Sequence, residues 1–342
     1  MAGPEHAQSK PAGLAVMEMI GAPWIAQAIY VIAKLEIPDK IATGVNTVRA
    51  LAAATQVSAD ALGRVLRALT VPGVLVDLGD GSYGLTPLSE MLQKSVPGSM
   101  HAMAVMFGEE FHWRPVGDML HSVRTGESAY SHVFGEPAFS HWQKNPEWFR
   151  IFNAAMTDFS RAAAPVLVAG FPWGRFKRLV DVGGGHGSLL AAILEANPNL
   201  QGTVFDLPQV ADGARAAVPS GLVKRMDAVG GDFLESVPAG GDAYMMKHIV
   251  HDWDDERCIR LFQNVRKVVP ADGRLLVLEM VVPPPGQPHM SKLLDIEMLL
   301  MTEGGRERTE AEFAALFARG GFKLVKVHAM PASTAVIEAQ PA

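Results

Sequence analysis

One stretch constrains the fold of this 342-residue chain more than any other: "RLVDVGGGHGSLLAAILEANP", which begins at Arg178. An apolar run that turns through clustered glycines into an amphipathic helix is typical of the start of a β–α unit. Gly183, Gly185 and Gly187 let a ligand approach the backbone closely and expose amides at a helix start. From Arg178 onward, short β-like runs alternate with helical patterns. This alternation predicts a parallel sheet with helices on both faces.

The sequence leaves two kinds of nucleotide ligand open for this glycine turn. A dinucleotide fingerprint needs glycine two and five residues after the first, but position 188 is serine. The alternative is a G-x-G-x-G motif preceded by an acid, Asp181. A nucleotide ligand bound by that motif need not contain a pyrophosphate. Asp206 ends the next β-like run, where an acid binds a ribose diol in either case. Asp232 and Phe233 follow a third run and suit an adenine amine and ring, although aspartate is also common in turns and helix caps.

Composition and charge narrow the class of protein. With 49% hydrophobic residues, the chain suits a soluble globular protein with a sizeable core. A net charge of −6 gives no bulk attraction to nucleic acid or an anionic membrane. The single cysteine, Cys258, excludes an intramolecular disulfide framework and a cysteine-rich metal site. The start "MAGPEHAQSKPAGL" lacks the apolar core of a signal peptide, and charge or proline interrupts the longest apolar stretches, so we expect a cytoplasmic protein with no membrane partner.

The amino-terminal third has the pattern of a helical module with a winged-helix order. Residues 14–40 are apolar on more than one side of one expected helix, which predicts cover by another subunit and hence a homodimer. Two helices joined at Gln56–Val57 follow, and then a hairpin around Gly79-Asp80-Gly81. Residues 1–95 carry seven Lys and Arg against eight Asp and Glu, so the basic footprint of a DNA reader is missing. We expect no nucleic-acid partner.

Six motifs in order carry a resemblance to a known family. They are "LVDVGGGHG", "FDLP", "GGDF", "HDWDDERC", "LLVLE" and "GGRERTEAEF". The chain resembles the small-molecule O-methyltransferases typified by plant caffeic acid and chalcone enzymes and by bacterial polyketide methyltransferases. The fold this implies is α/β, a Rossmann-like methyltransferase sheet with helices on both faces, plus an N-terminal, mostly helical winged-helix dimerisation domain. The expected parts are a dimerisation domain over 1–98, a helical connection lining the acceptor pocket over 99–165, and a catalytic domain over 166–342.

The resemblance also implies a cofactor, S-adenosyl-L-methionine. A lysine just past the end of a strand faces the cofactor crevice of such sheets, which adds Lys247 to the set. The expected cofactor-binding residues are Asp181, Gly183, Gly185, Asp206, Leu207, Asp232, Phe233 and Lys247.

The catalytic residues implied by the resemblance are His251 of "HDW" as the base, with Glu279 and Glu307 holding and polarising it. The chemistry explains this choice, because a phenol has a pKa near 10 and must lose its proton to accept a methyl group. Histidine is the usual base near neutral pH, and a carboxylate on its far nitrogen fixes the tautomer. We therefore expect methyl transfer to a phenolic hydroxyl of an aromatic, natural-product type of molecule.

Other interpretations of this segment remain open. His248 and His251 lie three residues apart near several acids, but the spacing lacks a second ligand cluster, so no metal is expected. His251 alone also suits a structural helix start. Some relatives bind the same cofactor yet hydroxylate or decarboxylate polyketides, and a winged-helix regulator is a third, less favoured hypothesis.

The acceptor pocket should be apolar and flat-sided. By resemblance, Met156 and Met298 match methionines that sandwich the acceptor ring, although with 17 methionines plain core packing is a serious alternative. The expected substrate-binding residues are Phe107, Trp113, Phe152, Asn153, Met156, Asp252 and Met298.

Overall fold

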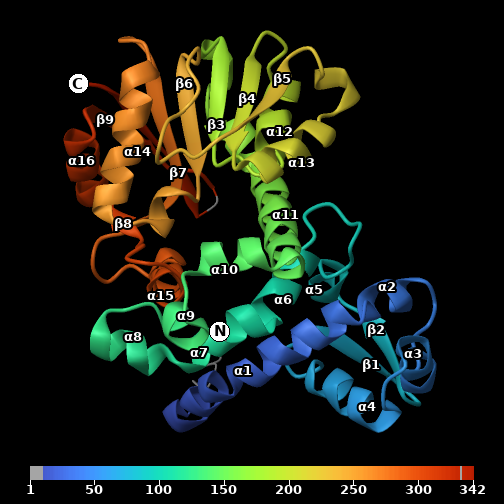
Figure 1. Ribbon diagram of the computed structural model, residues 1–342. Helices are drawn as coiled ribbons and strands as arrows, with labels where there is room; N and C mark the ends of the chain where they lie inside the picture. Colours follow the sequence, from blue (N-terminus) through green and yellow to red (C-terminus); the bar gives the residue numbers. More distant parts are fainter. Residues whose placement is uncertain (1–10, 332) are drawn as a thin grey trace, which may run out of the picture. The chain divides into compact units, whose positions relative to one another are not determined.

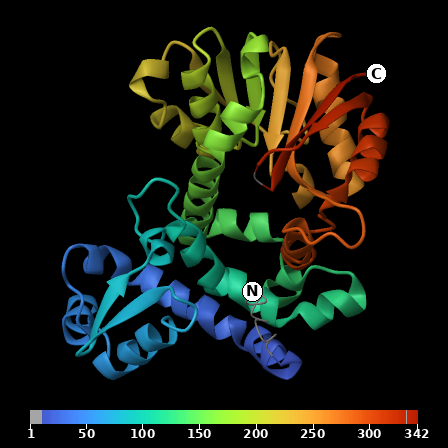
Figure 2. The same cartoon turned by 180° about the vertical axis from the view of Figure 1, so that it is seen from behind.

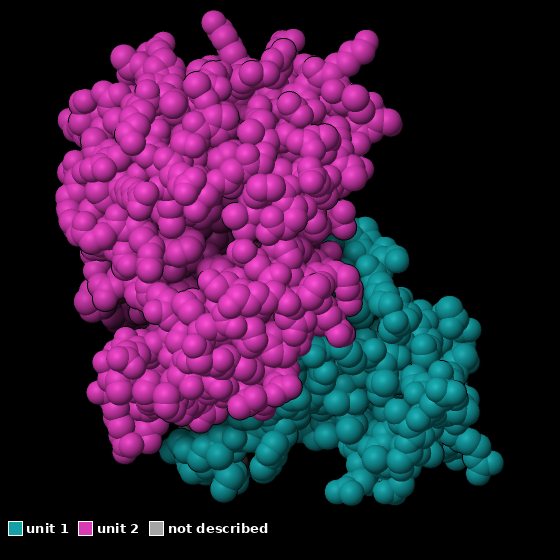
Figure 3. All heavy atoms as spheres, in the orientation of Figure 1, with its two compact units in different colours: residues 1–109 teal, residues 110–342 magenta. Residues whose placement is uncertain are grey.

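The computed structural model describes residues 11–331 and 333–342, which form two compact units. The units are Met1–Glu109 and Glu110–Ala342 (Figure 3). The segment before Pro11, on which the expected absence of a signal peptide partly rests, lies outside the described residues. The boundaries at 98 and 165 stay predictions; the first compact unit continues to Glu109, and one helix runs through position 165.

The first unit is helical with one small hairpin (Figure 1). Side chains of Thr47 and Ser58 cap the two helices of the winged-helix order, and Gln56 ends the first of them in a left-handed conformation. The hairpin closes on the glycines at 79 and 81, as the sequence predicts. The elements are α1 (Ala12–Lys34), α2 (Ile37–Ala42), α3 (Val48–Thr55), α4 (Ala59–Ala68), β1 (Leu75–Gly79), β2 (Ser82–Leu85), α5 (Pro87–Glu90) and α6 (His101–Gly108).

The single helix expected over 14–40 is wrong, because the structure has two helices there. Glu36 has a φ of 55°, in the left-handed region that interrupts a right-handed helix. Pro38 follows within the first turn of α2, where its fixed φ favours a new helix start and its missing N–H costs nothing.

Helix α1 exposes much of its apolar surface, with Met19 and Trp24 73% and 77% accessible. By length and composition the 23-residue helix could cross a membrane, since an 18-residue window within it has a mean hydropathy of 1.5. Glu18 and Pro23 nevertheless interrupt this apolar stretch, as the sequence predicted. An exposed apolar helix equally needs a protein partner, as the predicted homodimer supplies.

The second unit begins with helices and continues as an α/β sheet. The helical part contains α7 (Glu110–Gly117), α8 (Met119–Thr125), α9 (Ala129–Phe134), α10 (Ala138–Lys144), α11 (Pro146–Gly170) and η1 (Trp173–Arg175). The strands are β3 (Arg178–Val182), β4 (Gln201–Asp206), β5 (Met226–Gly230), β6 (Ala243–Lys247), β7 (Arg274–Val282), β8 (Arg308–Thr309), β9 (Phe322–His328) and β10 (Thr334–Pro341). The helices between them are α12 (Ser188–Ala196), α13 (Pro208–Ala216), η2 (Ser220–Leu222), η3 (Val250–Asp252), α14 (Asp255–Val268), α15 (Ser291–Met301) and α16 (Glu310–Arg319).

The sheet order is β5-β4-β3-β6-β7-β10-β9. Strands β3 to β7 pair in parallel, whereas β10 is antiparallel to β7 and β9. Viewed from behind, β9 and β10 occupy the red edge of the sheet (Figure 2). The chain thus ends in a hairpin, β9 and β10, that places one antiparallel strand in the sheet. From β3 the chain adds β4 and β5 on one side of the sheet, and it then returns to add β6 and β7 on the other side. The point between β3 and β6 is therefore the switch point, where α/β sheets bind ligands.

Successive side chains of each strand point to opposite faces of the sheet, and both sets are buried because helices cover both faces. Met245 packs in the core under α12 and α13, while its neighbours Tyr244 and Met246 pack in the core under α14 and α16. The helices on both faces predicted from the sequence are therefore present (Figure 1). The two cores hold the strand ends, and hence the loops of the site, at fixed positions.

Candidate active site

The glycine turn after β3 takes the backbone conformation that the sequence predicts. Gly183, Gly185 and Gly187 have φ values of 71°, 56° and 74°. A Cβ on Gly183 would come within 2.4 Å of the Ile249 side chain, whereas a Cβ on Gly185 would meet nothing within 4 Å. The turn is thus packed tightly underneath and open above Gly185.

Asp206 lies at the end of β4 and braces this turn. One carboxylate oxygen accepts the Gly185 N–H at 2.8 Å, and the other accepts the Leu207 N–H at 2.7 Å. Burial raises the pKa of Asp206. Asp181, 3% exposed on β3, has its pKa raised to about 7 by burial and by the nearby Asp206 charge. The neighbouring strands β3 and β4 therefore place the two predicted acids beside the same glycine turn.

Two further cofactor candidates follow β5. Asp232 is exposed, and its Oδ1 accepts the Leu234 N–H at 2.7 Å, which is the turn-capping contact weighed as an alternative to cofactor binding. Phe233 is partly buried and meets Trp253 edge-on at 6.0 Å between ring centroids. A cofactor role for this pair stays a prediction.

Lys247 ends β6 at the switch point, where helix α11 supplies its partners. Its Nζ donates to Ser160 Oγ at 3.3 Å and lies 4.5 Å from the centroid of the Phe159 ring. Burial lowers the pKa of Lys247 to about 8. A long cationic side chain is thus held near Asp181, on the strand that leads into the glycine turn.

The next residues turn sharply and present His251. His248 adopts a φ of 52°, rare for a residue with a side chain, and η3 then carries the buried His251. His251 Nδ1 lies 2.6 Å from Glu307 Oε1 and 3.6 Å from Glu279 Oε2. Its Nε2 lies 3.6 Å from Asp252 Oδ1. The structure therefore brings together all three predicted catalytic residues, which are up to 56 positions apart in the chain.

Glu279 holds the loop as well as facing the ring. This fully buried residue on β7 accepts the N–H groups of Ile249, Val250 and His251 through Oε1, at 3.1, 3.0 and 3.3 Å. The shorter ring contact belongs to Glu307. The two glutamates therefore differ in function: Glu279 fixes the backbone, and Glu307 fixes the imidazole.

The charges around His251 control its protonation. Burial lowers the pKa of His251, but the attraction of Glu279, Asp252 and Glu307 outweighs burial and raises the pKa to about 10. Burial raises the pKa of Asp252 to about 7. The pKa of Glu279 is lowered to about 2, because His251, His248 and the backbone donors offset its burial. The cluster thus keeps a negative charge beside the imidazole.

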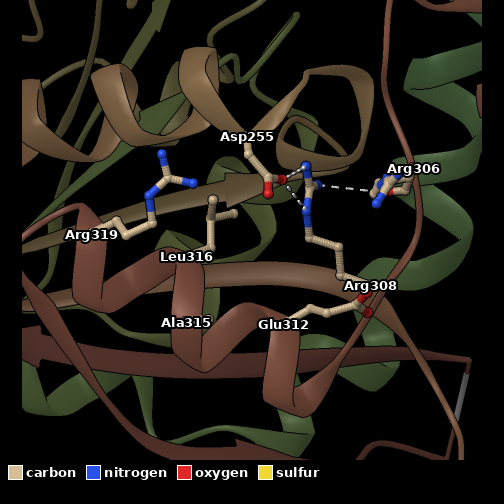
Figure 4. Close-up of a pocket in the computed structure, with 7 residues that line it drawn as sticks. All are labelled: Asp255, Arg306, Arg308, Glu312, Ala315, Leu316 and Arg319. Atoms are coloured by element: carbon tan, nitrogen blue, oxygen red, sulfur yellow. Dashed lines mark hydrogen bonds and ion pairs between the residues drawn. The ribbon is translucent and has the colours of Figure 1, made fainter.

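Sequence reasoning missed Arg308, which locks the His251 loop from below. Although 2% exposed, it donates to the carbonyls of Val250 and Trp253 at 3.1 and 2.9 Å and pairs with Asp255 at 2.8 Å. Arg308 and Asp255 line a hollow of about 100 Å³. Figure 4 shows the Arg308 guanidinium pointing at Asp255. The motif "GGRERT" contained this arginine, but its partners lie more than 50 residues earlier, so no local pattern revealed the contact.

The backbone around Glu307 is held as closely. Asp295 on α15 accepts the Glu307 N–H at 2.8 Å, and the neighbouring Arg306 N–H donates to the His251 carbonyl at 2.8 Å. A Cβ on Gly305 would come within 2.3 Å of Thr302 Oγ1 and 2.4 Å of the His251 carbonyl oxygen. Only glycine therefore allows this close approach of two loops.

Aromatic rings extend from the His251 loop into the helical part. Trp253 stacks with Phe139 at 5.9 Å, and Phe152 meets Phe139 at 5.8 Å and Trp142 at 4.7 Å. Among the predicted acceptor residues, Phe152 and Asp252 thus connect to the catalytic loop. The others are Trp113 on α7, Asn153 and Met156 on α11, Met298 buried on α15, and Phe107 on α6 of the first unit.

The structure also supplies a third potential metal ligand that the sequence did not reveal. One ligand atom each from His248, His251 and Glu279 lie within 4.8 Å of one another. Yet His251 Nδ1 already faces Glu307 at 2.6 Å, and Glu279 Oε1 accepts three amides. The expectation of no metal here stays a prediction.

The fold and the site define a class of protein. A parallel sheet with a late antiparallel strand, a glycine turn and a switch-point crevice are the architecture of class I S-adenosylmethionine-dependent methyltransferases. Residues 113–323 match the O-methyltransferase domain, and residues 17–95 match the O-methyltransferase dimerisation domain. The chain belongs to the O-methyltransferase family and is an S-adenosylmethionine-dependent methyltransferase, as the sequence motifs predicted.

Named relatives show the range of chemistry in this family. The chain is 39% identical to the phenazine O-methyltransferase PhzM of Lysobacter antibioticus over 98% of both proteins. It is 35% identical to an 8-amino-8-demethylriboflavin N,N-dimethyltransferase of Streptomyces davaonensis, over 92% of this chain and 91% of that protein. Among solved structures, an O-methyltransferase of neocarzinostatin biosynthesis (NcsB1) holds S-adenosylmethionine and 2-hydroxy-5-methyl naphthoic acid; its TM-score is 0.80 at 30% identity, covering 93% and 96% of the two chains.

The residues at the crevice fit the cofactor S-adenosylmethionine. The space above Gly185 is open, and the buried Asp181 and Lys247 offer opposite charges to the amino and carboxylate groups of a bound amino acid. Asp206 lies where a ribose diol is bound in doubly wound folds. The dimerisation domain likewise favours the dimer over the DNA-binding hypothesis.

Proposed function

We propose that the protein transfers the methyl group of S-adenosylmethionine to a phenolic hydroxyl of an aromatic natural-product type of molecule, with His251 as general base. The single observation that carries this proposal is the buried His251–Glu307 pair, 2.6 Å apart, beside the cofactor crevice. A histidine oriented by a carboxylate on one nitrogen can accept a proton on the other.

The two nitrogens of the His251 imidazole have different functions in the proposed proton transfer. Nδ1–H donates to Glu307, so Nε2 is the nitrogen that takes the acceptor's proton. S-adenosylmethionine supplies, when bound, a sulfonium-activated methyl group. A phenol has a pKa near 10, and the surrounding carboxylates raise the pKa of His251 to about 10. Proton transfer between such matched groups is not uphill, and the resulting imidazolium is stabilised by Glu279 and Glu307.

The acceptor proposed is flat and aromatic. Phe152 contacts Phe139, and Phe139 stacks on Trp253, which directly follows Asp252 in the catalytic loop. Aromatic side chains of this kind favour a planar binding partner. Trp113, Asn153, Met156 and Met298 complete the proposed wall in the second unit. Phe107, which the resemblance also named, lies on α6 of the first unit. We propose cofactor contacts at Asp181, Gly183, Gly185, Asp206, Leu207, Asp232, Phe233 and Lys247.

We further propose that the protein is a cytoplasmic homodimer. The domain match over 17–95 and the exposed apolar side chains of α1 support the dimer. Light scattering should report twice the 36.7 kDa chain mass. A monomer at working concentration would contradict this part of the proposal.

The test of base catalysis is His251→Ala assayed with two acceptors. With a phenol that is neutral at the assay pH, kcat should fall about 10²- to 10⁴-fold, the usual contribution of a general base. With a ring-substituted phenol already ionised at that pH, the fall should be much smaller. S-adenosylhomocysteine affinity is the control for folding. Equal losses with both acceptors, or near-normal turnover of the neutral phenol, would falsify the role of His251.

N-methylation is the second candidate, favoured by the dimethyltransferase relative that acts on an amino group. An aromatic amine is already nucleophilic without losing a proton, so His251→Ala should affect its methylation little. Matched acceptors that carry a hydroxyl or an amino group on the same ring separate the two reactions. Product mass then distinguishes gain of a methylene from gain of an oxygen, which would instead indicate hydroxylation.

A further inference from the structure

A second cluster of ligating side chains lies outside the active site, where α8 meets α9. Asp118 precedes α8, His121 lies in its first turn, and His132 lies on α9. One ligand atom from each lies within 4.8 Å of the other two. His132 Nδ1 is 2.6 Å from Asp118 Oδ2, and the two imidazole rings stack at 3.7 Å between centroids with 6° between planes.

A second carboxylate borders the cluster. Glu127 Oε2 lies 3.7 Å from His121 Nε2, a nitrogen that is buried and makes no hydrogen bond among the described residues. Asp118 and Glu127 thus place two carboxylates against the two stacked imidazoles. Imidazole nitrogens and carboxylate oxygens are common ligands of divalent metal ions.

We propose that Asp118, His121 and His132 form a binding site for one divalent late first-row transition-metal ion, with Zn²⁺ as the ion the ligand set fits. Two imidazoles and one carboxylate are a donor set suited to zinc, leaving a fourth position for water or for Glu127. This site is independent of the proposed chemistry at His251.

Small side-chain movements complete the coordination. Ligand atoms about 2.0–2.1 Å from a tetrahedral ion lie about 3.3 Å apart, so the Asp118–His132 contact must lengthen slightly. The stacked rings must also tilt, because one ion cannot lie in the planes of two parallel rings. His132 is 55% exposed at its side chain and can rotate, whereas His121, at 18%, is the more fixed ligand.

The ion would link two short helices that pack against α15. Ser128 at the start of α9 donates to the Leu300 carbonyl of α15 at 3.0 Å. Asp295 of α15 in turn accepts the backbone N–H of Glu307. A bound ion would therefore stabilise the helices that support α15, and thermal unfolding should report it.

The test is titration of Zn²⁺ into metal-free full-length protein, followed by calorimetry and by Co²⁺ absorption spectra. Four proteins are compared: wild type, His132→Ala, Asp118→Asn and His251→Ala. The last is the matched control, because it removes a ligand from the other possible trio, His248, His251 and Glu279.

Wild type and His251→Ala should share a site of equal affinity and a tetrahedral Co²⁺ spectrum. Loss of an outer partner typically weakens metal affinity about 10- to 100-fold, so losing a ligand in His132→Ala should weaken Zn²⁺ binding at least about 10-fold. Asp118→Asn keeps the shape of the side chain and should also bind more weakly. Zinc should raise the melting temperature of wild type but not of His132→Ala.

Three results would overturn the proposal: wild type that binds no Zn²⁺, His132→Ala and Asp118→Asn that bind as tightly as wild type, or loss of the site in His251→Ala alone. Circular dichroism without metal checks that each variant is folded. Because His132 is largely exposed, its truncation should leave the fold intact.

Discussion

Two loops flank the switch point of the sheet, and they are held in different ways. The glycine turn after β3 combines unusual glycine dihedral angles with few side-chain contacts: the Gly187 N–H donates to the Gly184 carbonyl at 2.9 Å, and the Asp206 carboxylate accepts the Gly185 N–H. The His251 loop after β6 is held by buried charged side chains: Glu279 from β7, Glu307 from the segment before β8, and Arg308. The first loop depends on residues that can reach unusual dihedral angles. The second depends on residues whose charges must be compensated.

This difference predicts different sensitivities to substitution. A buried charge that keeps its partners contributes little net stability, but removing one partner leaves the other uncompensated. The His251 loop should therefore fail when a distant glutamate or glycine changes, while the glycine turn stays intact. Measuring activity and cofactor affinity together separates the two loops.

The largest effect is expected for Glu279→Ala. The change leaves the amides of Ile249, Val250 and His251 without their buried acceptor, which should lower the free energy of unfolding by about 3–5 kcal/mol. Chemical denaturation gives the loss, and turnover should fall with it. Glu279→Gln, which retains an acceptor oxygen, is the control and should lose less. A wild-type unfolding curve for Glu279→Ala would show that the amides find other partners.

A smaller effect is expected for Gly305→Ala, which tests how closely two loops approach. The added Cβ would meet Thr302 Oγ1 at 2.3 Å and the His251 carbonyl at 2.4 Å, so the segments must separate. Overpacking of this kind costs about 1–3 kcal/mol. Turnover should drop while S-adenosylhomocysteine affinity is kept. Gly221→Ala is the control, because a Cβ there would meet nothing within 4 Å and neither Gly221 nor Gly305 has a positive φ.

The smallest effect on folding is expected for Glu307→Gln, whose clearest result is a pH shift. Because the pKa of His251 is raised to about 10, the neutral base and hence turnover of one chosen phenol should increase with pH and level off near 10. Glu307→Gln removes one of the three carboxylates around His251. The rise of turnover should therefore shift to a pH about one unit lower, the low end of the effect of an adjacent opposite charge on a pKa.

The same pKa has a consequence for stability with a defined sign. The folded pKa of His251 lies above the unfolded value of 6.5, so its stabilisation is fully present below about pH 6.5 and is lost as pH rises toward 10. Unfolding curves at pH 7 and 9.5 compare wild type with Glu307→Gln. If both the pH–rate limb and the stability slope are identical in the two proteins, Glu307 does not tune His251.

The sequence predicted many details of the structure where the signal is local. The winged-helix order followed from the turn at Gln56–Val57 and the hairpin glycines, and the structure adds the helix caps at Thr47 and Ser58. The glycine turn and its acid at Asp206 followed from a motif that occupies about one β–α–β unit. The helix break at Glu36 was missed, because a left-handed glutamate has no distinct sequence pattern and the apolar spacing continues across it.

By itself, the sequence determined most of the elements and the α/β fold class, because hydrophobic period, glycine turns and caps act over a few residues. The candidate reactive side chains came from the resemblance of its motifs to a known family. Only the tertiary structure decided that Glu307 faces the His251 ring while Glu279 holds its backbone. It also decided that Arg308 binds the carbonyls of the His251 loop, and that Asp118 and two histidines converge elsewhere. The physical reason is distance along the chain: electrostatic coupling depends on separation in space, and packing of the sheet and helices fixes which charges meet.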